Sequence, residues 1–209
     1  MSGSGTDVRH IGILLFDQVE ELDAVGPWEV LASWARSCPA DGWAVCTLAR
    51  DRAPVSCANG LCIVPHHTLD DAPALDVLIH PGGQGTRPLL TDDEHLTWLR
   101  TQRERVPLMT SVCTGSLVYA AAGLLRDRPA TTHWSSLDLL GKLDPSIEVR
   151  DEVRFVDDGD IITSAGVSAG IDMALHLITR LAGPDRARQV ERDIQYDRRP
   201  KPVRHPGAR

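Results

Sequence analysis

The chain alternates between short apolar runs and amphipathic segments. The apolar runs have the length and continuous hydrophobicity of strands buried on both faces, and they occupy residues 8–16, 43–49, 76–80 and 108–112. The segments that follow have the spacing of helices, and they occupy residues 27–34, 92–105, 114–125, 168–181 and 185–196. This alternation predicts a mainly parallel sheet with helices on both faces.

Local signals set several boundaries of these elements. Gly26-Pro27 predicts a helix start, because proline in the first turn lacks only an N–H that has no partner there. Ser168 is a candidate N-cap, and Gly183-Pro184 marks the end of the same helix. A tight turn at Asp158-Gly159 predicts a pair of strands. The shorter expected elements are that pair, over 148–155 and 160–163, a strand or hairpin near 61–64, and a strand-to-helix step within 131–140.

No internal repeat and no long linker divides the 209 residues. We therefore predict a single α/β domain over residues 1–209, a three-layer, doubly wound fold with a mainly parallel sheet. Residues 1–7 and 198–209 are expected to be flexible tails. Ligands of such folds bind beyond the carboxyl ends of the strands, so candidate chemistry is sought there.

Composition narrows the classes of function. The 29 acidic residues outnumber the 22 basic ones, and a net charge of −7 disfavours nucleic acid as a partner. No apolar stretch approaches the ~18–20 residues of a membrane span. The first ten residues lack the apolar core of a secretory signal. These features predict a cytoplasmic protein that has no membrane or nucleic-acid partner.

The cysteines point to one candidate nucleophile. Their odd number and the lack of a Cys-x-x-Cys pair predict reduced thiols without a structural zinc site. Only Cys113 stands where a predicted strand passes directly into a predicted helix, an arrangement typical of a nucleophile elbow. The helix N-terminus favours the thiolate and a lowered pKa. The competing interpretation is that Cys113 is a packed core residue, as we expect of the others, Cys38, Cys46, Cys57 and Cys62.

Two further segments belong to the same predicted strand ends. The glycines Gly82 and Gly83 follow the run 76–80, and the N–H groups of Gly83 and Thr114 are candidates for an anion hole. Asp23 is the acid nearest the expected helix start, where capping is the simpler interpretation. A carboxyl group beside a thiolate has a raised pKa, so the pair can exist as thiolate plus carboxylic acid.

Together these segments resemble the ThiJ/PfpI superfamily, whose flavodoxin-like fold is similar to that of the class I glutamine amidotransferase domain. They follow the family order from about residue 10 to 180, and the similarity is greatest to the isonitrile (isocyanide) hydratase branch. The matching pieces are IGILLF at 11–16, ELDAVGP at 21–27, PGG at 81–83, SVCTG at 111–115, THW at 132–134 and SAGVSAGID at 164–172.

The resemblance implies roles for individual residues. Cys113 is expected to be the nucleophile, Asp23 the acid beside it, Thr114 its neighbour, and Gly166 part of a loop near the site. The resemblance also implies a homodimer with no metal and no organic cofactor. Peptidase and amidotransferase branches pair the cysteine with a histidine, whereas Thr114 follows Cys113 here.

Two secondary candidates complete the expected site. His133 is the one histidine near it, although a histidine before Trp134 is more often structural. Gly82 is the other secondary candidate. We therefore expect no Cys-His-Glu triad, which disfavours peptidase and glutaminase activity.

The leading hypothesis is a cysteine-dependent lyase that hydrates an isocyanide to an N-substituted formamide. Cys113 attacks the terminal carbon, Asp23 supplies a proton to give a thioimidate, and ionised Asp23 then activates water. One alternative is a glyoxalase-like enzyme acting on reactive carbonyls. The other is a non-enzymatic sensor of ligand or oxidation through Cys113. Related domains are fused to helix-turn-helix segments, and we expect no DNA-binding domain after the last predicted helix.

Overall fold

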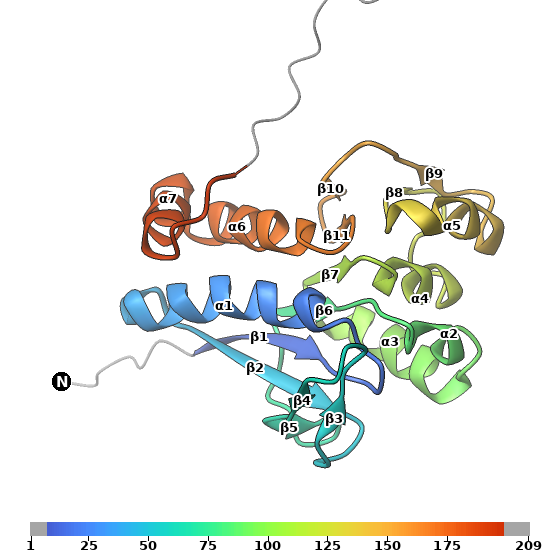
Figure 1. Cartoon of the computed structure of the whole chain (residues 1–209), viewed down its shortest axis with the longest axis horizontal. Coiled ribbons are helices and arrows are strands. Elements are labelled where there is room, and N and C mark those ends of the chain that lie inside the picture. Colours follow the sequence, from blue (N-terminus) through green and yellow to red (C-terminus); the bar gives the residue numbers. More distant parts are fainter. Residues whose placement is uncertain (1–7, 199–209) are drawn as a thin grey trace, which may run out of the picture.

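The computed structural model describes residues 8–198, so the predicted tails at 1–7 and 198–209 lie outside the described residues except for Arg198. A seven-stranded sheet forms its centre (Figure 1). All neighbouring strands are parallel except the pair β10–β11 at one edge. In spatial order the strands are β10 (Phe155–Asp157), β11 (Ile161–Ser164), β7 (Leu108–Val112), β6 (Val77–His80), β1 (Arg9–Leu14), β2 (Trp43–Ala49) and β5 (His67–Thr68).

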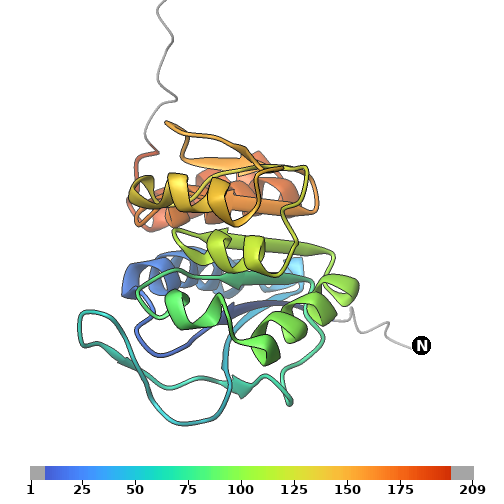
Figure 2. The same cartoon turned by 90° about the vertical axis from the view of Figure 1, so that its right-hand side faces the viewer.

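Helices cover both faces of this sheet, which confirms the predicted doubly wound α/β class (Figure 2). One face is packed by α1 (Glu21–Ser37), α6 (Ala169–Ala182) and α7 (Pro184–Asp193). The other is packed by α2 (Thr86–Leu89), α3 (Asp93–Arg105), α4 (Gly115–Ala121) and α5 (Leu137–Leu143). Small pairings, β3 (Val55–Ser56) with β4 (Cys62–Ile63) and β8 (Pro129–Ala130) with β9 (Glu148–Val149), lie outside the main sheet.

Strand β1 shows why the strands of this sheet are continuously apolar in sequence. Successive side chains of a strand point to opposite faces, and both faces of this sheet are covered. Ile11 and Ile13 pack into the core beneath α1 and α6, whereas Leu14 packs into the opposite core. Gly12 faces that second core, where a Cβ would lie 2.7 Å from Leu48 and Leu75 side-chain atoms. The position therefore requires glycine for packing density.

The predicted start of the first helix is wrong. Helix α1 begins at Glu21, so Pro27 lies inside it and is not in its first turn. The acidic residues Glu21 and Asp23 occupy the first turn, where the helix dipole favours them. Pro27 is buried against α6, 3.3 Å from the position of a Cβ on Gly170. Packing of α1 on α6 offsets the interruption that proline causes in an isolated helix.

Several boundaries in the second half also differ from the prediction. The strand expected over 148–155 is two separate pieces: β9 pairs with β8, and β10 pairs with β11. The turn between β10 and β11 is confirmed, because Asp158 N–H donates to the Ile161 carbonyl and Gly159 has a φ of +84°. Ser168 precedes α6, but its side chain does not cap the helix; its Oγ accepts a hydrogen bond from Arg154. Gly183 ends the same helix as predicted.

Within residues 8–198, no helix has the length and apolar character needed to cross a bilayer. The five cysteines are all unpaired thiols, and Cys62 is the exposed one. The fold brings the carboxyl ends of β1, β6, β7 and β11 to one edge of the sheet. The segments that follow these strands build the site described next.

Candidate active site

The predicted sharp turn is present at Cys113. Strand β7 ends at Val112 and α4 begins at Gly115, and Cys113 between them has a φ of +56°. This left-handed backbone is uncommon for a residue with a side chain and is held only where surrounding contacts determine it. Cys113 N–H donates to the Ser164 carbonyl at 3.0 Å, and its own carbonyl accepts from Thr132 Oγ1 at 2.9 Å. The turn is therefore anchored on both sides.

Gly115 lets this turn approach the end of β6. A Cβ at residue 115 would lie 2.1 Å from the His80 carbonyl oxygen and 2.8 Å from that of Pro81. Any larger residue would push α4 away from the loop that follows β6. Gly115, two residues after the predicted nucleophile, is therefore required for steric reasons.

Cys113 is 6% exposed and borders a cavity of about 160 Å³. That volume suits a small molecule rather than a polymer segment. Residues from the segments after β1, β6, β7, β8 and β11 line it, among them Glu20, Gly83, Arg87, Thr114, His133 and Val167. Glu20 and Arg87 are charged lining residues that the sequence analysis missed. The signal for Arg87 was weak, because α2, which carries it, is too short to show helical periodicity.

Asp23 reaches the site from the first turn of α1 and is fully buried. Its Oδ2 accepts the Gly82 N–H at 3.1 Å, and its carboxyl group lies close enough to the Cys113 thiol for each group to shift the pKa of the other. Oδ1 is also buried, and it has no hydrogen-bond partner among the described residues. Burial raises the pKa of Asp23 to about 7, although the hydrogen bonds from Cys113 and Gly82 act in the opposite direction. The expected acid with a raised pKa is therefore present beside the cysteine.

The prediction that the pKa of Cys113 is lowered is wrong. Burial raises the pKa of the Cys113 thiol, and the charge of the neighbouring Asp23 carboxylate raises it further. Hydrogen bonds from the Thr114 backbone and side chain lower it but do not outweigh these effects. The charge effect vanishes when Asp23 is protonated. A thiolate at this position consequently requires that Asp23 hold the proton.

The glycine loop after β6 packs tightly against both reactive groups. A Cβ on Gly82 would lie 2.5 Å from Thr114 N and 2.9 Å from Asp23 Oδ2. Gly83 has a φ of +121° and lines the cavity, but its N–H donates to Thr114 Oγ1 at 3.0 Å. Of the two N–H groups expected to form an anion hole, that of Thr114 faces the Cys113 sulfur and that of Gly83 is already paired.

The loop between β11 and α6 brings Gly166 against the nucleophile. A Cβ at residue 166 would lie 2.8 Å from Cys113 Sγ and 2.6 Å from His133 Cδ2. His133 borders the cavity, and its Nδ1 lies 2.8 Å from Ser135 Oγ. No hydrogen bond joins His133 to Cys113 within residues 8–198. Of the seven residues expected from the sequence, four line this cavity, and the other three, Asp23, Gly82 and Gly166, pack behind those lining residues.

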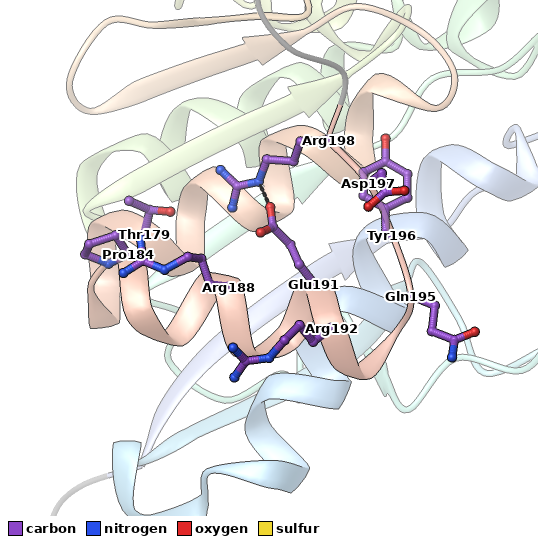
Figure 3. Close-up of a pocket in the computed structure, with 9 residues that line it drawn as sticks. All are labelled: Thr179, Pro184, Arg188, Glu191, Arg192, Gln195, Tyr196, Asp197 and Arg198. Carbon is purple, nitrogen blue, oxygen red and sulfur yellow. Dashed lines mark ion pairs between the residues drawn. The ribbon is translucent and has the colours of Figure 1, made fainter.

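A larger cavity lies elsewhere in the described part of the chain, between α6, α7 and the segment that follows α7 (Figure 3). Its volume is about 710 Å³, and most of the side chains that line it are charged or polar, with Glu191 paired to Arg198. It holds no cysteine and none of the buried acids described above. Size alone therefore does not locate the candidate chemistry in this protein.

Comparison with known proteins assigns the fold to a family. The sequence profile described as the DJ-1/PfpI family matches residues 9–180. The chain belongs to the DJ-1/PfpI family. This confirms the resemblance to the ThiJ/PfpI superfamily that the six sequence pieces indicated.

Individual members of the DJ-1/PfpI family show how widely the similarity extends. The chain is 44% identical over 187 residues to isonitrile hydratase of Pseudomonas putida, which covers 90% of this chain and 78% of that protein. It is 32% identical over 190 residues to the HTH-type transcriptional regulator GbdR of Pseudomonas aeruginosa, covering 91% of this chain and 51% of the regulator. A ThiJ/PfpI family protein from Pseudomonas syringae superposes with a TM-score of 0.82 at 32% identity, covering 99% of this chain and 86% of that one.

Proposed function

We propose that this member of the DJ-1/PfpI family is an isonitrile hydratase, a lyase that adds water to R–N≡C and releases the formamide R–NH–CHO. The carrying observation is the buried pair of Asp23 and Cys113, in which a carboxyl group with a pKa raised to about 7 lies beside a thiol. Such a pair supplies a nucleophile and a proton donor at the same carbon. The 44% identity with an isonitrile hydratase supports the same substrate class.

In the first step the Cys113 sulfur forms a bond to the terminal isocyanide carbon. The lone pair of that carbon takes the proton held by Asp23, which gives the thioimidate R–N=CH–S–Cys113 and leaves Asp23 as a carboxylate. The reaction needs the form of the pair that carries one proton. Thr114 N–H faces the sulfur and stabilises its negative charge before attack.

In the second step Asp23 removes a proton from water, whose oxygen attacks the thioimidate carbon. Asp23 passes that proton to the nitrogen and then accepts the hydroxyl proton as the C–S bond breaks. The products are the formamide, the Cys113 thiolate and a protonated Asp23. The pair thereby returns to its starting state without any other proton carrier.

The test uses purified protein and an alkyl isocyanide, with formamide followed by mass spectrometry. We expect turnover by the wild type and by Cys62→Ala, which removes an exposed thiol remote from the pair. Cys113→Ala and Asp23→Asn are expected to lose at least about 10³-fold in kcat/KM, as is typical for removal of a nucleophile or its proton donor. Full turnover by Cys113→Ala would contradict the covalent scheme. Methylglyoxal in a parallel assay separates this function from action on reactive carbonyls.

We further propose a single-domain, cytoplasmic homodimer whose one partner beside its own copy is a small-molecule substrate. The family resemblance supports the dimer and an active site without a metal or organic cofactor, and the net charge of −7 disfavours nucleic acid. Light scattering after size exclusion measures the oligomeric state directly, and a monomeric mass would contradict the proposal.

A further inference from the structure

Two buried histidines stand behind the glycine loop of the site. His80 ends β6 and is fully buried, and its Nδ1 lies 2.8 Å from the Pro81 carbonyl oxygen. Its Nε2 lies 3.1 Å from His95 Nε2, on helix α3. The carbonyl can only accept, so the hydrogen of a neutral His80 is on Nδ1. His80 Nε2 is then an acceptor, and His95 Nε2–H donates to it.

The acceptor of His80 belongs to the peptide unit that holds Asp23. The Pro81 carbonyl and the Gly82 N–H are the two polar groups of a single peptide bond, and this N–H donates to Asp23 Oδ2 at 3.1 Å. A hydrogen bond accepted by a peptide carbonyl polarises the unit and strengthens its N–H as a donor. An unbroken chain of donors therefore runs from His95 through His80 and the Pro81–Gly82 peptide to the carboxyl group of Asp23.

We propose that His80 and His95 are positioning residues that fix the Pro81–Gly82 peptide and set the proton affinity of Asp23, and thereby the proton distribution of the Asp23–Cys113 pair. Neither histidine touches the cavity at Cys113. The role of these hydrogen bonds in catalysis rests on the proposed function, whereas their effect on Asp23 is a property of the protein without substrate.

Both histidines keep these donor and acceptor roles at neutral pH. Burial lowers the pKa of His80 to about 3, and the neighbouring His95 acts in the same direction. Burial also lowers the pKa of His95 to about 4, against the opposing charge of Asp92 and together with that of Arg50. Tyr119 is the other titratable group that faces His80, and Glu20 with Cys113 faces Asp23. Both rings are therefore neutral, and His95 donates to His80, which donates to the Pro81 carbonyl.

The direction of the effect follows from which form the hydrogen bond stabilises. A donor to the carboxylate lowers the pKa of an acid, so a weaker Gly82 N–H raises it. His80→Leu removes the donor to Pro81. His80→Asn restores it, because the asparagine side-chain NH₂ group occupies a position close to that of histidine Nδ1.

The experiment titrates Asp23 in the substrate-free protein by difference infrared spectroscopy. The carboxylic acid C=O band is assigned by its loss in Asp23→Asn, and the S–H band of Cys113 is followed in parallel. We expect the midpoint of the Asp23 band to move upward by about 0.5–1 pH unit in His80→Leu and to return to the wild-type value in His80→Asn. Tyr119→Phe is the matched control, because it removes a buried hydrogen bond to the Thr110 carbonyl beside His80 without touching the chain of donors.

A second pair of variants covers the case in which His80→Leu does not fold. His95 borders a cavity of about 430 Å³, so its truncation enlarges an existing space. His95→Leu should move the Asp23 midpoint upward by a smaller amount, and His95→Gln should restore it. An unchanged midpoint in the leucine variants, or an equal shift in Tyr119→Phe, would overturn the proposal. Failure of the wild type to hydrate isocyanides would contradict the proposed function alone, because the titration needs no substrate.

Discussion

Gly166 lies so close to Cys113 that a Cβ on it would be 2.8 Å from the sulfur. The same atom would be 2.6 Å from His133 Cδ2, so the loop between β11 and α6 closes one side of the nucleophile. Both distances are shorter than an ordinary van der Waals contact. The absence of a side chain at residue 166 therefore leaves the space that the Cys113 sulfur occupies beside the cavity.

We predict that Gly166→Ala lowers kcat/KM at least about tenfold, because the sulfur must move and a displacement of this size misaligns attack. The cost in stability should be about 1–2 kcal/mol, as for modest overpacking. Gly141→Ala in α5 is the control, since a Cβ there would lie 3.5 Å from Val149, an ordinary contact. That variant should keep full activity. Steady-state kinetics and urea unfolding test both variants, and equal activity of the two alanine variants would refute the steric explanation.

The raised pKa of Asp23 predicts a pH-dependent stability. A carboxyl group whose folded pKa is about 7 and whose ordinary value is 3.8 stabilises the fold fully at pH values below 3.8. This contribution is lost as the pH rises through 7, and about three pKa units correspond to roughly 4 kcal/mol. The free energy of unfolding of the wild type relative to Asp23→Asn should therefore fall between about pH 4 and 7 and then level off. Urea unfolding of both proteins across that range measures it, and parallel curves would show that Asp23 ionises normally.

The same pair predicts the pH dependence of the reaction. The reactive form carries one proton, and the pair loses its first proton near pH 7 because of the burial of Asp23. The second proton leaves only at much higher pH, since burial and Asp23 raise the pKa of Cys113. We expect kcat/KM to rise with pH up to about 7 and then to reach a plateau. Initial rates with an alkyl isocyanide from pH 5 to 9 test this, and a decline beginning near pH 7 would indicate a different active protonation state.

The loop that carries Gly166 is supported by an ion pair. Arg154 Nε donates to Asp172 Oδ2 at 2.7 Å in the first turn of α6, and Arg154 also donates to Ser168 Oγ. The Asp172 side chain is 8% exposed, so Arg154→Met leaves a buried charge without its main partner.

We expect Arg154→Met to lower the free energy of unfolding by about 2–3 kcal/mol and to reduce activity through the loop. The matched control is Arg52→Met, whose partner Asp71 lies at the surface. Loss of an exposed pair should cost at most about 1 kcal/mol and leave activity unchanged. Chemical denaturation separates the two, and similar small losses would show that the buried pair is not a support of the fold.

The sequence alone determined the kinds of element, their order and the reactive residue types. Continuous apolar runs identified β1, β2, β6 and β7 within a few residues, because burial on both faces leaves a local signature in each strand. The junction at Cys113 was visible for the same reason, since a strand that passes directly into a helix is a feature of neighbouring residues.

Only the tertiary structure decided what depends on segments that are distant in the chain. The position of Pro27 inside α1 depends on α6, and the pairing of the Gly83 N–H with Thr114 depends on how two strand ends meet. The proton affinities of Asp23 and Cys113 depend on desolvation by the whole surrounding fold, which no local pattern records. Local sequence can place a thiol at a helix start, whereas the desolvation of that thiol and its proximity to a buried acid are consequences of packing.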